Sequence, residues 1–404
     1  MTKPSSSNNK PRVLFICPQP FFEWRGSPIR VKANVTALSE LGYDVDLLTL
    51  PIGAEQHIDN VRIIRGWDFF GSTKISIGPS LLKLWFDMIL LIQGLTLIMR
   101  NKYQILHGTE EAGFICYLLS LVSRKQFIFE KHSDSNSYQP SGLLKPILKL
   151  YRLTEKLTII KSNSVISTGP ALDEQAKDDA NISQSNIDGS DKFFVIPDTP
   201  SSTLEPSEDE INQARQSLIS SPDDVIISYA GSFASYQGID IIFDAIPSIV
   251  SENPHAKFAI IGGSSSEITH YQTLLKQQGV EEHHIQFLGK IHPDKLPAYL
   301  AAADILLAPR KSGVNSPLKI LDYFKAGAAI VATNTSANQR LLNNDNAVLC
   351  EFSATAFSKA IKDLSSSKEQ RERLGKNAHK LYKTQYNFEQ FKQQLGAVYQ
   401  KLNT

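Results

Sequence analysis

One segment in the second half of the sequence combines a small-residue loop, a helix start and a cation. The apolar run 304–309 predicts a strand, and Ser316 followed by Pro317 is typical of the first turn of a helix. The N–H groups of a first turn have no partner inside the helix and favour an anion. Lys319 falls in that turn, where a cation is unfavourable unless an anion lies near it. The segment therefore predicts a diphosphate-binding site.

Asp322 follows Lys319 by three residues, which places both side chains on the same side of the expected helix. From there the carboxylate could hydrogen-bond a hydroxyl of the ligand whose phosphates Lys319 contacts. The alternative is a surface ion pair between the two side chains, worth about 0.2–0.5 kcal/mol. The spacing allows both interpretations.

Three further loops lie between an apolar run and a helical segment. They hold small or polar residues: Gly26 and Ser27, then Ser232 and Gln237, then Gly262 and Gly263. Glycine lets a backbone approach an anion closely, but a plain turn with a helix cap explains each loop by itself equally well. None of them matches the GxGxxG dinucleotide fingerprint or the Walker GxxxxGK[ST] motif.

These loops belong to a chain in which short apolar runs and helix-length segments alternate almost throughout. The expected strands are 13–17, 44–50, 61–65, 104–107, 126–130, 164–167 and 193–196, then 224–231, 257–263, 285–289, 304–309, 329–333 and 347–350. Apolar strands separated by helices are typical of parallel sheets covered on both faces. The predicted fold class is α/β, with two doubly wound, Rossmann-like domains and a cleft between them. Ligands of such sheets bind beyond the carboxyl ends of the strands.

A stretch rich in Pro, Ser and acidic residues separates the two halves. The predicted boundaries are a disordered tail at 1–11, a first domain at 12–197, a linker at 198–222, a second domain at 223–385, and a closing helix at 386–404 that packs back on the first domain. The polar tail lacks the apolar core of a secretion signal, and the apolar run 88–99 is too short to span a bilayer. A cytoplasmic protein is expected.

The overall charge is balanced, with 42 Lys and Arg against 41 Asp and Glu, which argues against a dedicated nucleic-acid binder. Residues 61–161 nevertheless hold 14 basic and 7 acidic side chains. The three cysteines are far apart and form no cluster with histidines, so no zinc site or disulfide framework is expected.

The ordered set of segments in the second half resembles the nucleotide-sugar half of GT-B-fold retaining glycosyltransferases of family 4, the group 1 glycosyltransferases. The similar segments are YAGSFASYQGID, FAIIGG, IQFLGKI, LPAYLAAADILLAP and SPLKILDYFKAGAAIVAT. The first half is similar through RGSPIRVKANVTALSELGYDVDLLT, HGTEE, FEKHSD and KSNSVIST. The resemblance implies transfer of a hexose from a UDP- or GDP-linked sugar to a glycan or lipid-linked hydroxyl, with the first domain holding the acceptor.

The resemblance also implies roles for individual residues. The catalytic set is His132 near the transferred sugar, Lys319 on the diphosphate and Asp322 on the ribose. The donor-binding set is Gly26, Ser27, Ser232, Gln237, Gly262, Gly263, Ile291, Asn315, Ser316, Pro317 and Leu318. Glu110 and Glu111 either contact the acceptor or cap the next helix. No DxD motif follows a strand, so no metal is expected, and the leaving phosphate is expected to assist deprotonation of the acceptor.

The sequence departs from the family pattern at three positions. Val314 replaces the first acid of the Glu-x7-Glu motif, and Ser232 and Gln237 stand where relatives often carry phosphate-binding cations. A catalytically degenerate relative that binds a nucleotide sugar or a partner enzyme is therefore an alternative. A nucleotide-sugar epimerase of the same architecture is a further one, although the segments SPLKILDYFKAG and AADILLAP fit it poorly.

Four basic residues, Lys145, Lys149, Arg152 and Lys156, are spaced four, three and four apart and share one helical face. Leu150, Leu153, Leu157 and Ile160 share a neighbouring face. A basic amphipathic helix can lie on an anionic membrane, and the alternative is the solvated outer face of a core-packed helix. Since many similar enzymes glycosylate lipid-linked acceptors, a peripheral position at the inner membrane face is an additional expectation.

Overall fold

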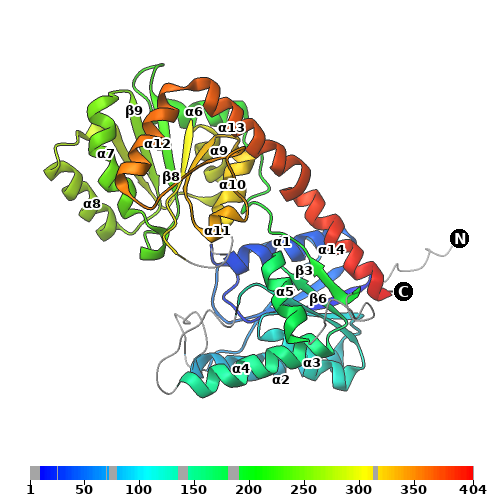
Figure 1. The fold of residues 1–404 in the computed structure, drawn as a ribbon. Coiled ribbons are helices and arrows are strands. Elements are labelled where there is room, and N and C mark those ends of the chain that lie inside the picture. The colour runs from blue at the N-terminus through cyan, green and yellow to red at the C-terminus, as the bar shows by residue number, and fades with distance from the viewer. Residues whose placement is uncertain are drawn as a thin grey trace, which may run out of the picture. The chain divides into compact units, whose positions relative to one another are not determined.

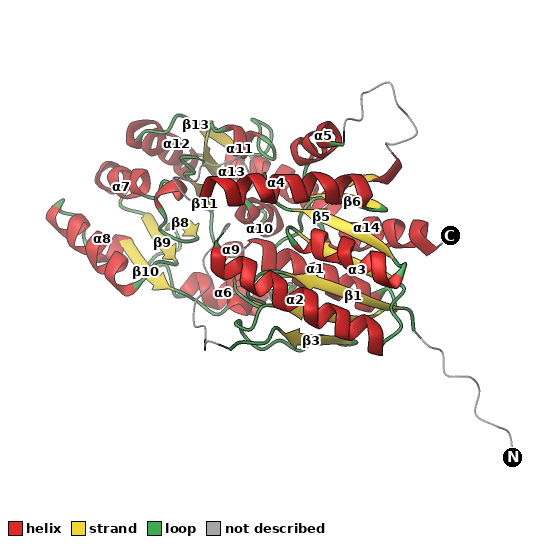
Figure 2. Ribbon diagram, turned by 90° about the horizontal axis from the view of Figure 1, so that it is seen from below, coloured by secondary structure: helices red, strands yellow, loops and turns green. Residues whose placement is uncertain are grey.

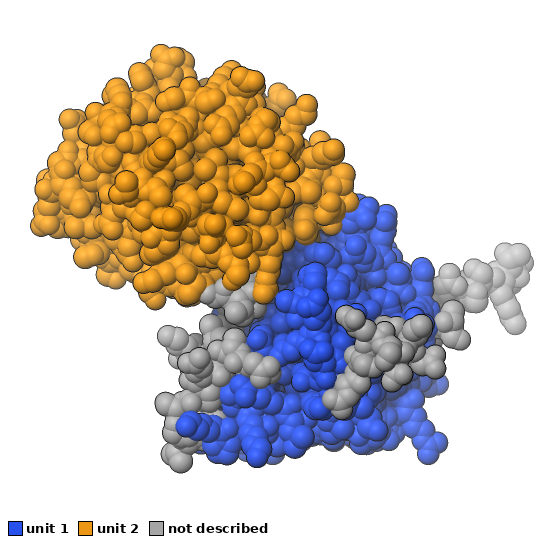
Figure 3. Space-filling view, in the orientation of Figure 1, with its two compact units in different colours: residues 1–198, 388–404 blue, residues 199–387 orange. Residues whose placement is uncertain are grey.

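The computed structural model describes residues 10–24, 26–69, 71, 80–134, 144–180, 191–312 and 317–403. The chain forms two compact units, which Figure 1 traces as ribbons and Figure 3 colours separately. Unit 1 comprises residues 1–198 and 388–404, and unit 2 comprises residues 199–387. Unit 1 is therefore built from both ends of the chain.

Unit 1 contains a seven-stranded sheet in the order β3-β2-β1-β4-β5-β6-β7. Its strands are β1 (Arg12–Cys17), β2 (Asp44–Thr49), β3 (Val61–Arg65), β4 (Ile105–Thr109), β5 (Gln126–Lys131), β6 (Ser164–Ser167) and β7 (Phe193–Val195). All neighbouring strands pair in parallel. The central strands are buried along nearly their whole length, as their apolar sequences predict. The polar residues that follow β1, β4 and β5 consequently meet at one edge of the sheet.

The helices of unit 1 are α1 (Gly26–Glu40), α2 (Leu81–Arg100), α3 (Ala112–Ser123), α4 (Leu144–Lys161), α5 (Pro170–Asp179) and α14 (Phe388–Asn403). Helices α2, α3 and α4 form one layer on one face of the sheet, while α1 and α14 lie together on the other (Figures 1 and 2). Leu395, Val398 and Tyr399 on α14 are completely buried. The last residues of the chain therefore complete the core of unit 1.

Unit 2 contains a six-stranded sheet in the order β10-β9-β8-β11-β12-β13. Its strands are β8 (Val225–Ala230), β9 (Ala256–Ile261), β10 (Ile285–Gly289), β11 (Ile305–Ala308), β12 (Ala329–Thr333) and β13 (Val348–Cys350). Its helices are α6 (Glu208–Gln216), α7 (Asp240–Glu252), α8 (Ser265–Gln277), α9 (Leu296–Ala301), α10 (Leu318–Ala326), α11 (Ser336–Gln339), α12 (Ala354–Ser366) and α13 (Lys368–Leu381), and α13 continues as a π-helix (Tyr382–Tyr386). Again every pairing is parallel. The predicted α/β class with two doubly wound parallel sheets is confirmed.

The expected linker 198–222 contains a helix, and from Thr199 onward it belongs to unit 2. Ser207 and Glu210 form a capping box at the start of α6, in which each side chain accepts a hydrogen bond from the other residue's backbone N–H. Arg215 near the end of α6 donates to Asp304 at 3.1 Å and to the Ala302 carbonyl at 2.9 Å. The Ser/Glu spacing was therefore a helix signal inside a segment whose composition suggested a loop.

The apolar helix α2 is longer than the run 88–99 suggested. It has 20 residues and, by length and composition alone, is long and apolar enough to cross a membrane. The expectation that the apolar segment is only 12 residues long, and so too short to span a bilayer, was therefore wrong. One side of α2 packs into the core of unit 1 through Phe86, Ile89 and Leu90. The other side exposes large apolar residues: Leu81, Leu84, Trp85, Met88, Ile92 and Met99.

Candidate functional site

In unit 2, the carboxyl end of β8 meets the first turn of α10. Lys319 reaches from α10 so that its Nζ lies 4.1 Å from the centre of the Tyr229 ring. Gly231 follows β8 with φ +153°, and a Cβ atom there would lie 2.6 Å from Lys319 Nζ. A side chain at position 231 would therefore displace the ammonium group. The sequence TyrAlaGly at 229–231 supplies both the ring under the cation and the space beside it.

The Lys319 ammonium is buried and has no hydrogen-bond partner among the described residues. Burial, together with the nearby guanidinium of Arg310, lowers the pKa of Lys319 from its ordinary value of 10.5 to about 7. Arg310 follows β11, and its guanidinium lies 5.7 Å from the centre of the Tyr236 ring. Among the residues that the structure describes, neither Lys319 nor Arg310 pairs with a carboxylate, which makes this edge of the sheet suited to an anion. Sequence reasoning missed Arg310.

Lys319 forms no ion pair with Asp322 among the described contacts, so the surface-pair interpretation was wrong. The Asp322 carboxylate instead accepts hydrogen bonds from the backbone N–H and the hydroxyl of Ser201, at 2.7 and 2.9 Å. Burial raises the pKa of Asp322 to about 6, although the two Ser201 bonds and Lys325 oppose the rise. The two residues predicted to share a ligand are therefore held in different surroundings.

Asp322 lies in the wall of a cavity of about 160 Å³ within unit 2. The polar lining comes from Ser201, Ser202, Glu205, Asp322 and Lys325, and the apolar lining includes Leu296 and Leu300 of α9. Lys325 donates to the carbonyls of Ser202 and Leu204 at 3.0 and 2.6 Å. A cavity of about 150 Å³ accommodates one benzene-sized ring, so this space suits a single small group.

Four other residues of unit 2 that were predicted to bind the sugar donor lie in the loops after β8 and β9. Gly262 (φ +117°) packs against the backbone of Gly231, where a Cβ would overlap the Gly231 carbonyl. Gly263 leaves room for the Phe233 ring. Ser232 accepts from the Tyr229 hydroxyl through its backbone carbonyl at 2.7 Å, and Gln237 ends a short 3-10 turn at Ser235–Gln237. The glycines therefore shape the loop beside Lys319, while Ser232 supplies a backbone contact.

Pro317 is the N-cap residue of α10 and Leu318 its first residue, as the Ser-Pro signal predicted. Ile291 follows β10 and is half-buried against the core of unit 2. Asn315 and Ser316, together with Val314, lie outside the described residues. The backbone amides assigned to the phosphates at these positions stay a prediction.

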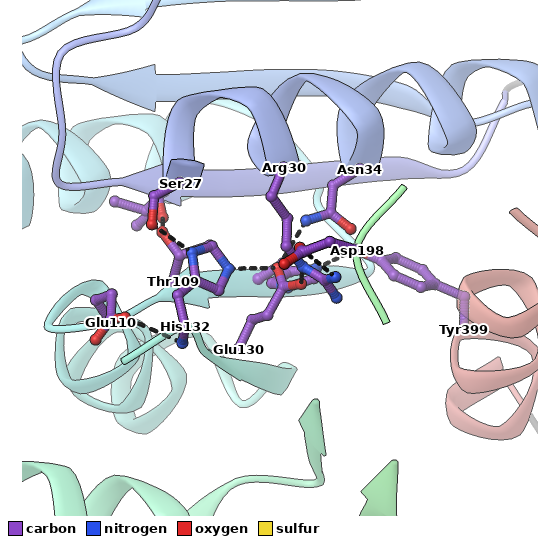
Figure 4. A network of polar contacts seen from close by, with 11 residues as sticks. Ser27, Arg30, Asn34, Thr109, Glu110, Glu130, His132, Asp198 and Tyr399 are labelled. Atoms are coloured by element: carbon purple, nitrogen blue, oxygen red, sulfur yellow. Dashed lines mark hydrogen bonds and ion pairs between the residues drawn. The ribbon is translucent and has the colours of Figure 1, made fainter. Parts of the chain in front are cut away.

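In unit 1, Ser27 and His132 are brought together although they are 105 residues apart. Ser27 in the first turn of α1 places its Oγ 2.7 Å from His132 Nδ1, just after β5 (Figure 4). The backbone N–H of His132 donates to Glu110 at 3.0 Å. Gly26 begins the helix that carries Ser27 and is exposed. The two residues assigned to different ligand groups thus form one hydrogen-bonded unit.

Behind His132 lies a buried ionic cluster centred on Glu130 of β5. Arg30 Nε donates to Glu130 at 2.6 Å, and the same guanidinium donates to Asp198 at 3.0 Å. Burial alone would raise the pKa of Glu130, but Arg30, His132 and contacts from His107 outweigh it and hold the pKa well below its usual range. Glu130 is therefore ionised inside the protein.

Glu110 and Glu111 do not cap the helix that follows them through their side chains. Glu110 bonds His132 and accepts from the Tyr151 hydroxyl at 3.2 Å, and burial raises its pKa. Glu111 forms an ion pair with Lys83 of α2, and no side-chain bond caps α3 at this residue. Of the two alternatives, side-chain capping was wrong, and Glu110 supports His132 directly.

The basic stripe on α4 faces outward, with Lys145, Lys149 and Arg152 exposed and Lys156 half-buried. Three of the neighbouring apolar residues are exposed as well: Leu150, Leu153 (65% exposed) and Ile160. The buried side of α4 instead carries Leu148, Glu155, Thr158 and Ile159, and Glu155 pairs with Lys131. The apolar residues beside the basic stripe therefore lie largely at the surface, as the basic residues do.

Six residues of the unit 1 cluster were not singled out from the sequence: Arg30, Asn34, His107, Glu130, Asp198 and Tyr399. Arg30, His107 and Glu130 lie within the segments RGSPIRVKAN, HGTEE and FEKHSD that carried the resemblance. A charged residue inside an apolar strand, such as Glu130 in QFIFEK, was the available signal. Tyr399 had no such signal because its partner His107 is 292 residues away.

Within the described ranges, no group of three or more His, Cys, Asp or Glu side chains is arranged to hold a metal ion. Arg310 is cationic in the free protein, and a bound anion favours the charged form of Lys319, so the two side chains can neutralise an anion by themselves.

Comparisons with known proteins agree with this architecture. Residues 210–381 match the family model described as "Glycosyl transferases group 1". Spore coat protein SA of Bacillus subtilis is 25% identical over 185 residues, which are 44% of this chain and 48% of that protein. A phosphatidyl-myo-inositol mannosyltransferase of Mycobacterium tuberculosis is 26% identical over 108 residues, 27% of each chain. The matched parts thus span about half or less of these relatives.

Solved structures match over nearly the whole chain. A sucrose-phosphate synthase from Thermosynechococcus elongatus superposes with a TM-score of 0.75 at 20% identity, covering 98% of this chain and 99% of that one. HepE of Anabaena in complex with UDP gives a TM-score of 0.71 at 15% identity, covering 96% and 100%. At these identities the likeness concerns the fold, which is the two-domain GT-B fold of glycosyltransferases.

Proposed function

We propose that this chain is a retaining glycosyltransferase that transfers a hexose from a UDP- or GDP-linked sugar to a hydroxyl of a glycan or lipid-linked acceptor. The family-model match in unit 2 and the fold support the class of enzyme. The observation that carries the proposal is the buried Lys319 ammonium, which has no described partner and lies near a second cation. A donor diphosphate supplies the charge that this edge of the sheet requires.

The loop at 229–231 and the start of α10 would hold the diphosphate in unit 2. Lys319 and Arg310 are cations, and Gly231 and Gly262 leave the backbone open at the sheet edge. Departure of the nucleotide develops negative charge on the leaving phosphate, and fixed cations in a dry site stabilise that charge. Arg310 takes the role of the loop cations that Ser232 and Gln237 do not provide. Asp322, bonded to Ser201, would contact the ribose through its remaining lone pairs.

The carboxyl edge of unit 1 would bind the transferred sugar and the acceptor. His132 lies at this edge, supported by Ser27 and Glu110. In the proposed reaction the glycosidic carbon–phosphate oxygen bond breaks, and the acceptor oxygen attacks on the same face. The acceptor proton passes to the departing phosphate oxygen, so configuration is retained without an enzyme nucleophile. No metal ion is part of the proposal.

Donor binding is the direct test. UDP-glucose, UDP-N-acetylglucosamine and GDP-mannose are titrated into the full chain by calorimetry, and Lys319→Met is compared with Lys325→Met on the same helix. We expect only Lys319→Met to lose binding, by about tenfold or more, since it removes a charge-assisted contact worth about 1.5–3 kcal/mol. Equal affinity in wild type and Lys319→Met would refute the assignment.

Turnover separates the enzyme from its alternatives. Nucleotide release is measured with the donor that binds, with and without bacterial lipid extract, and the anomeric configuration of the product is determined. Release that requires an acceptor supports the transferase. Binding without any turnover supports the degenerate relative, and conversion of the donor sugar without an acceptor supports the epimerase.

We propose in addition that unit 1 contacts the anionic inner face of a membrane through α2 and α4, so that the enzyme is cytoplasmic and peripheral. The support is the combination on one layer of exposed cations (Lys145, Lys149) and exposed apolar side chains (Leu150, Leu153) on α4. In addition, α2 exposes Trp85 and Met88. Only one acidic residue lies in α4, and that residue, Glu155, is buried. Basic residues with adjacent apolar side chains bind anionic lipid surfaces.

Vesicle sedimentation tests this surface. Lys145→Gln with Lys149→Gln should weaken binding to phosphatidylglycerol vesicles roughly 30-fold, at about 1 kcal/mol per cation. The matched control is Lys359→Gln with Lys376→Gln, two exposed lysines of unit 2, which should leave binding unchanged. Absence of binding at low ionic strength, or equal loss in both double variants, would contradict the proposal.

A further inference from the structure

Glu130 lies between two histidines inside unit 1. Its Oε2 atom is 3.2 Å from His107 Nε2 and 3.5 Å from His132 Nε2, as Figure 4 shows for His132. Arg30 donates to Oε1 and Asn34 Nδ2 donates to Oε2 at 2.7 Å. All of these polar contacts are shielded from solvent, because Glu130 and His107 are completely buried. One carboxylate is thus the common neighbour of two imidazole rings.

An ionised carboxylate only accepts hydrogen bonds, so an imidazole nitrogen that faces it carries the proton. This places the proton of each histidine on Nε2. In a neutral imidazole the other nitrogen, Nδ1, is then an acceptor.

The groups facing the two Nδ1 atoms agree with this assignment. Ser27 Oγ lies 2.7 Å from His132 Nδ1, and the Tyr399 hydroxyl lies 2.8 Å from His107 Nδ1. Hydroxyl groups can donate to these nitrogens, whereas a carbonyl oxygen in the same place would have required the proton on Nδ1. The arrangement is therefore the same at both histidines: a hydroxyl group hydrogen-bonds Nδ1. The Glu130 carboxylate lies 3.2 to 3.5 Å from Nε2 as an ion-pair contact, and neither Nε2 has another described partner.

We propose that Glu130 is a positioning residue that holds His132 and His107 as the Nε2–H tautomer. Through His132 it also orients the Ser27 hydroxyl, whose proton points to Nδ1 and whose lone pairs stay available to a ligand. Through His107 it ties the sheet to Tyr399 on α14. Arg30 keeps the carboxylate in place and, by its bond to Asp198, anchors the last residue of unit 1 before the chain enters unit 2.

The assignment has a consequence for the reaction, which rests on the proposed function. His132 with Nε2–H toward Glu130 and Nδ1 bonded to Ser27 has no free lone pair for the proton of an acceptor. His132 is therefore not the general base, and it acts on a ligand through the Ser27 hydroxyl, whose lone pairs stay available. This agrees with transfer of the acceptor proton to the leaving phosphate.

Nitrogen-15 NMR of the full chain measures the tautomers directly. The protein contains nine histidines, and the signals of His132 and His107 are assigned from His132→Gln and His107→Gln. In wild type at pH 7.5 we expect both to show a protonated Nε2 and an unprotonated Nδ1. A proton on Nδ1 of His132 would overturn the proposal without any further variant.

Glu130→Gln then tests the cause. We expect the single tautomer pattern of both histidines to be replaced by a mixture, because the carboxamide can donate as well as accept. The matched control is Asp46→Asn, another buried carboxylate of unit 1, which bonds Arg62 and Tyr103 but neither histidine. Folded Glu130→Gln protein with unchanged histidine signals would overturn the proposal. If Glu130→Gln does not fold, the wild-type spectrum decides.

These measurements need no substrate, so their outcome is separable from that of the proposed function. Where a donor and acceptor support turnover, Glu130→Gln should lower kcat about tenfold with little change in the donor KM, since it disturbs the orientation of His132 and not the unit 2 site. If Glu130→Gln alters the histidine tautomers but leaves kcat unchanged, Glu130 has a structural role only, and the proposed link to catalysis is overturned.

Discussion

Binding of a nucleotide sugar should be coupled to protonation of Lys319. In the free protein burial and Arg310 hold the pKa of this amine at about 7. A bound diphosphate places negative charge beside the amine and returns its pKa toward the ordinary value of 10.5. Binding above pH 7 therefore takes up a proton, because the complex contains the charged amine and the free protein mostly does not.

The magnitude follows from the fraction of free protein that is already protonated. With a pKa of about 7, this fraction is about 0.9 at pH 6, about 0.5 at pH 7 and about 0.1 at pH 8. The expected proton uptake is therefore about 0.1, 0.5 and 0.9 proton per bound donor at these pH values. Donor affinity should fall about tenfold from pH 6 to pH 8, or about 1.4 kcal/mol.

Calorimetry in two buffers of different ionisation enthalpy measures the uptake. A sugar-nucleotide diphosphate is suited to the experiment because both phosphates are esterified and neither has the second phosphate pKa near 6. Lys319→Met should bind weakly and without proton uptake, whereas Lys325→Met should keep the coupling. Tight donor binding at pH 8 with no proton uptake would refute the assignment of Lys319 to the diphosphate.

Three further predictions follow from particular contacts. Gly231→Ala should weaken donor binding at least tenfold by calorimetry, because its Cβ would lie 2.6 Å from Lys319 Nζ; unchanged affinity would show that the ammonium does not need this position. Asp322→Asn should gain up to about 3 kcal/mol in unfolding free energy relative to wild type between pH 4 and pH 7.5 in urea titrations. The sign follows because the pKa of Asp322 is about 6 in the folded protein and 3.8 ordinarily. The protonated carboxyl group therefore stabilises wild type at low pH, and this stability is lost as the pH rises through 6. A difference in unfolding free energy between Asp322→Asn and wild type that does not change with pH would contradict the prediction. Tyr399→Phe should cost about 1–3 kcal/mol of unfolding free energy by leaving His107 Nδ1 buried without its donor, and an unchanged midpoint would argue against that bond.

The sheets were predictable from the sequence because each strand is a short apolar run, and such runs have few other uses in a soluble α/β chain. The helix in the expected linker was missed since composition outweighed the Ser207–Glu210 capping signal. The periodicity of α4 predicted which residues share a face of the helix, but it did not predict which face packs against the core. The buried side of α4 is a mixed one that carries Leu148 and Ile159 together with Glu155, which pairs with Lys131.

In the candidate site, the sequence predicted the features that depend only on neighbouring residues. The positions of Lys319 and Pro317 at the start of α10 came from a helix-start signal. The hydrogen-bond partner of Asp322 could not be predicted in this way, because Ser201 is 121 residues away in the sequence. The Glu130 cluster joins α1, β4, β5 and α14, so its assembly depends on pairings that no short segment contains.

The way in which unit 1 is built bears on how the protein is synthesised. Residues 199–387 form a continuous unit with its own core, whereas the first 198 residues need α14 from the end of the chain. During synthesis on the ribosome, residues 1–198 therefore emerge first and lack α14 until unit 2 has been synthesised and has folded. We expect the nascent first half to depend on chaperones until Tyr399 has emerged, and a truncation before residue 388 to yield a soluble unit 2 attached to an unfinished partner.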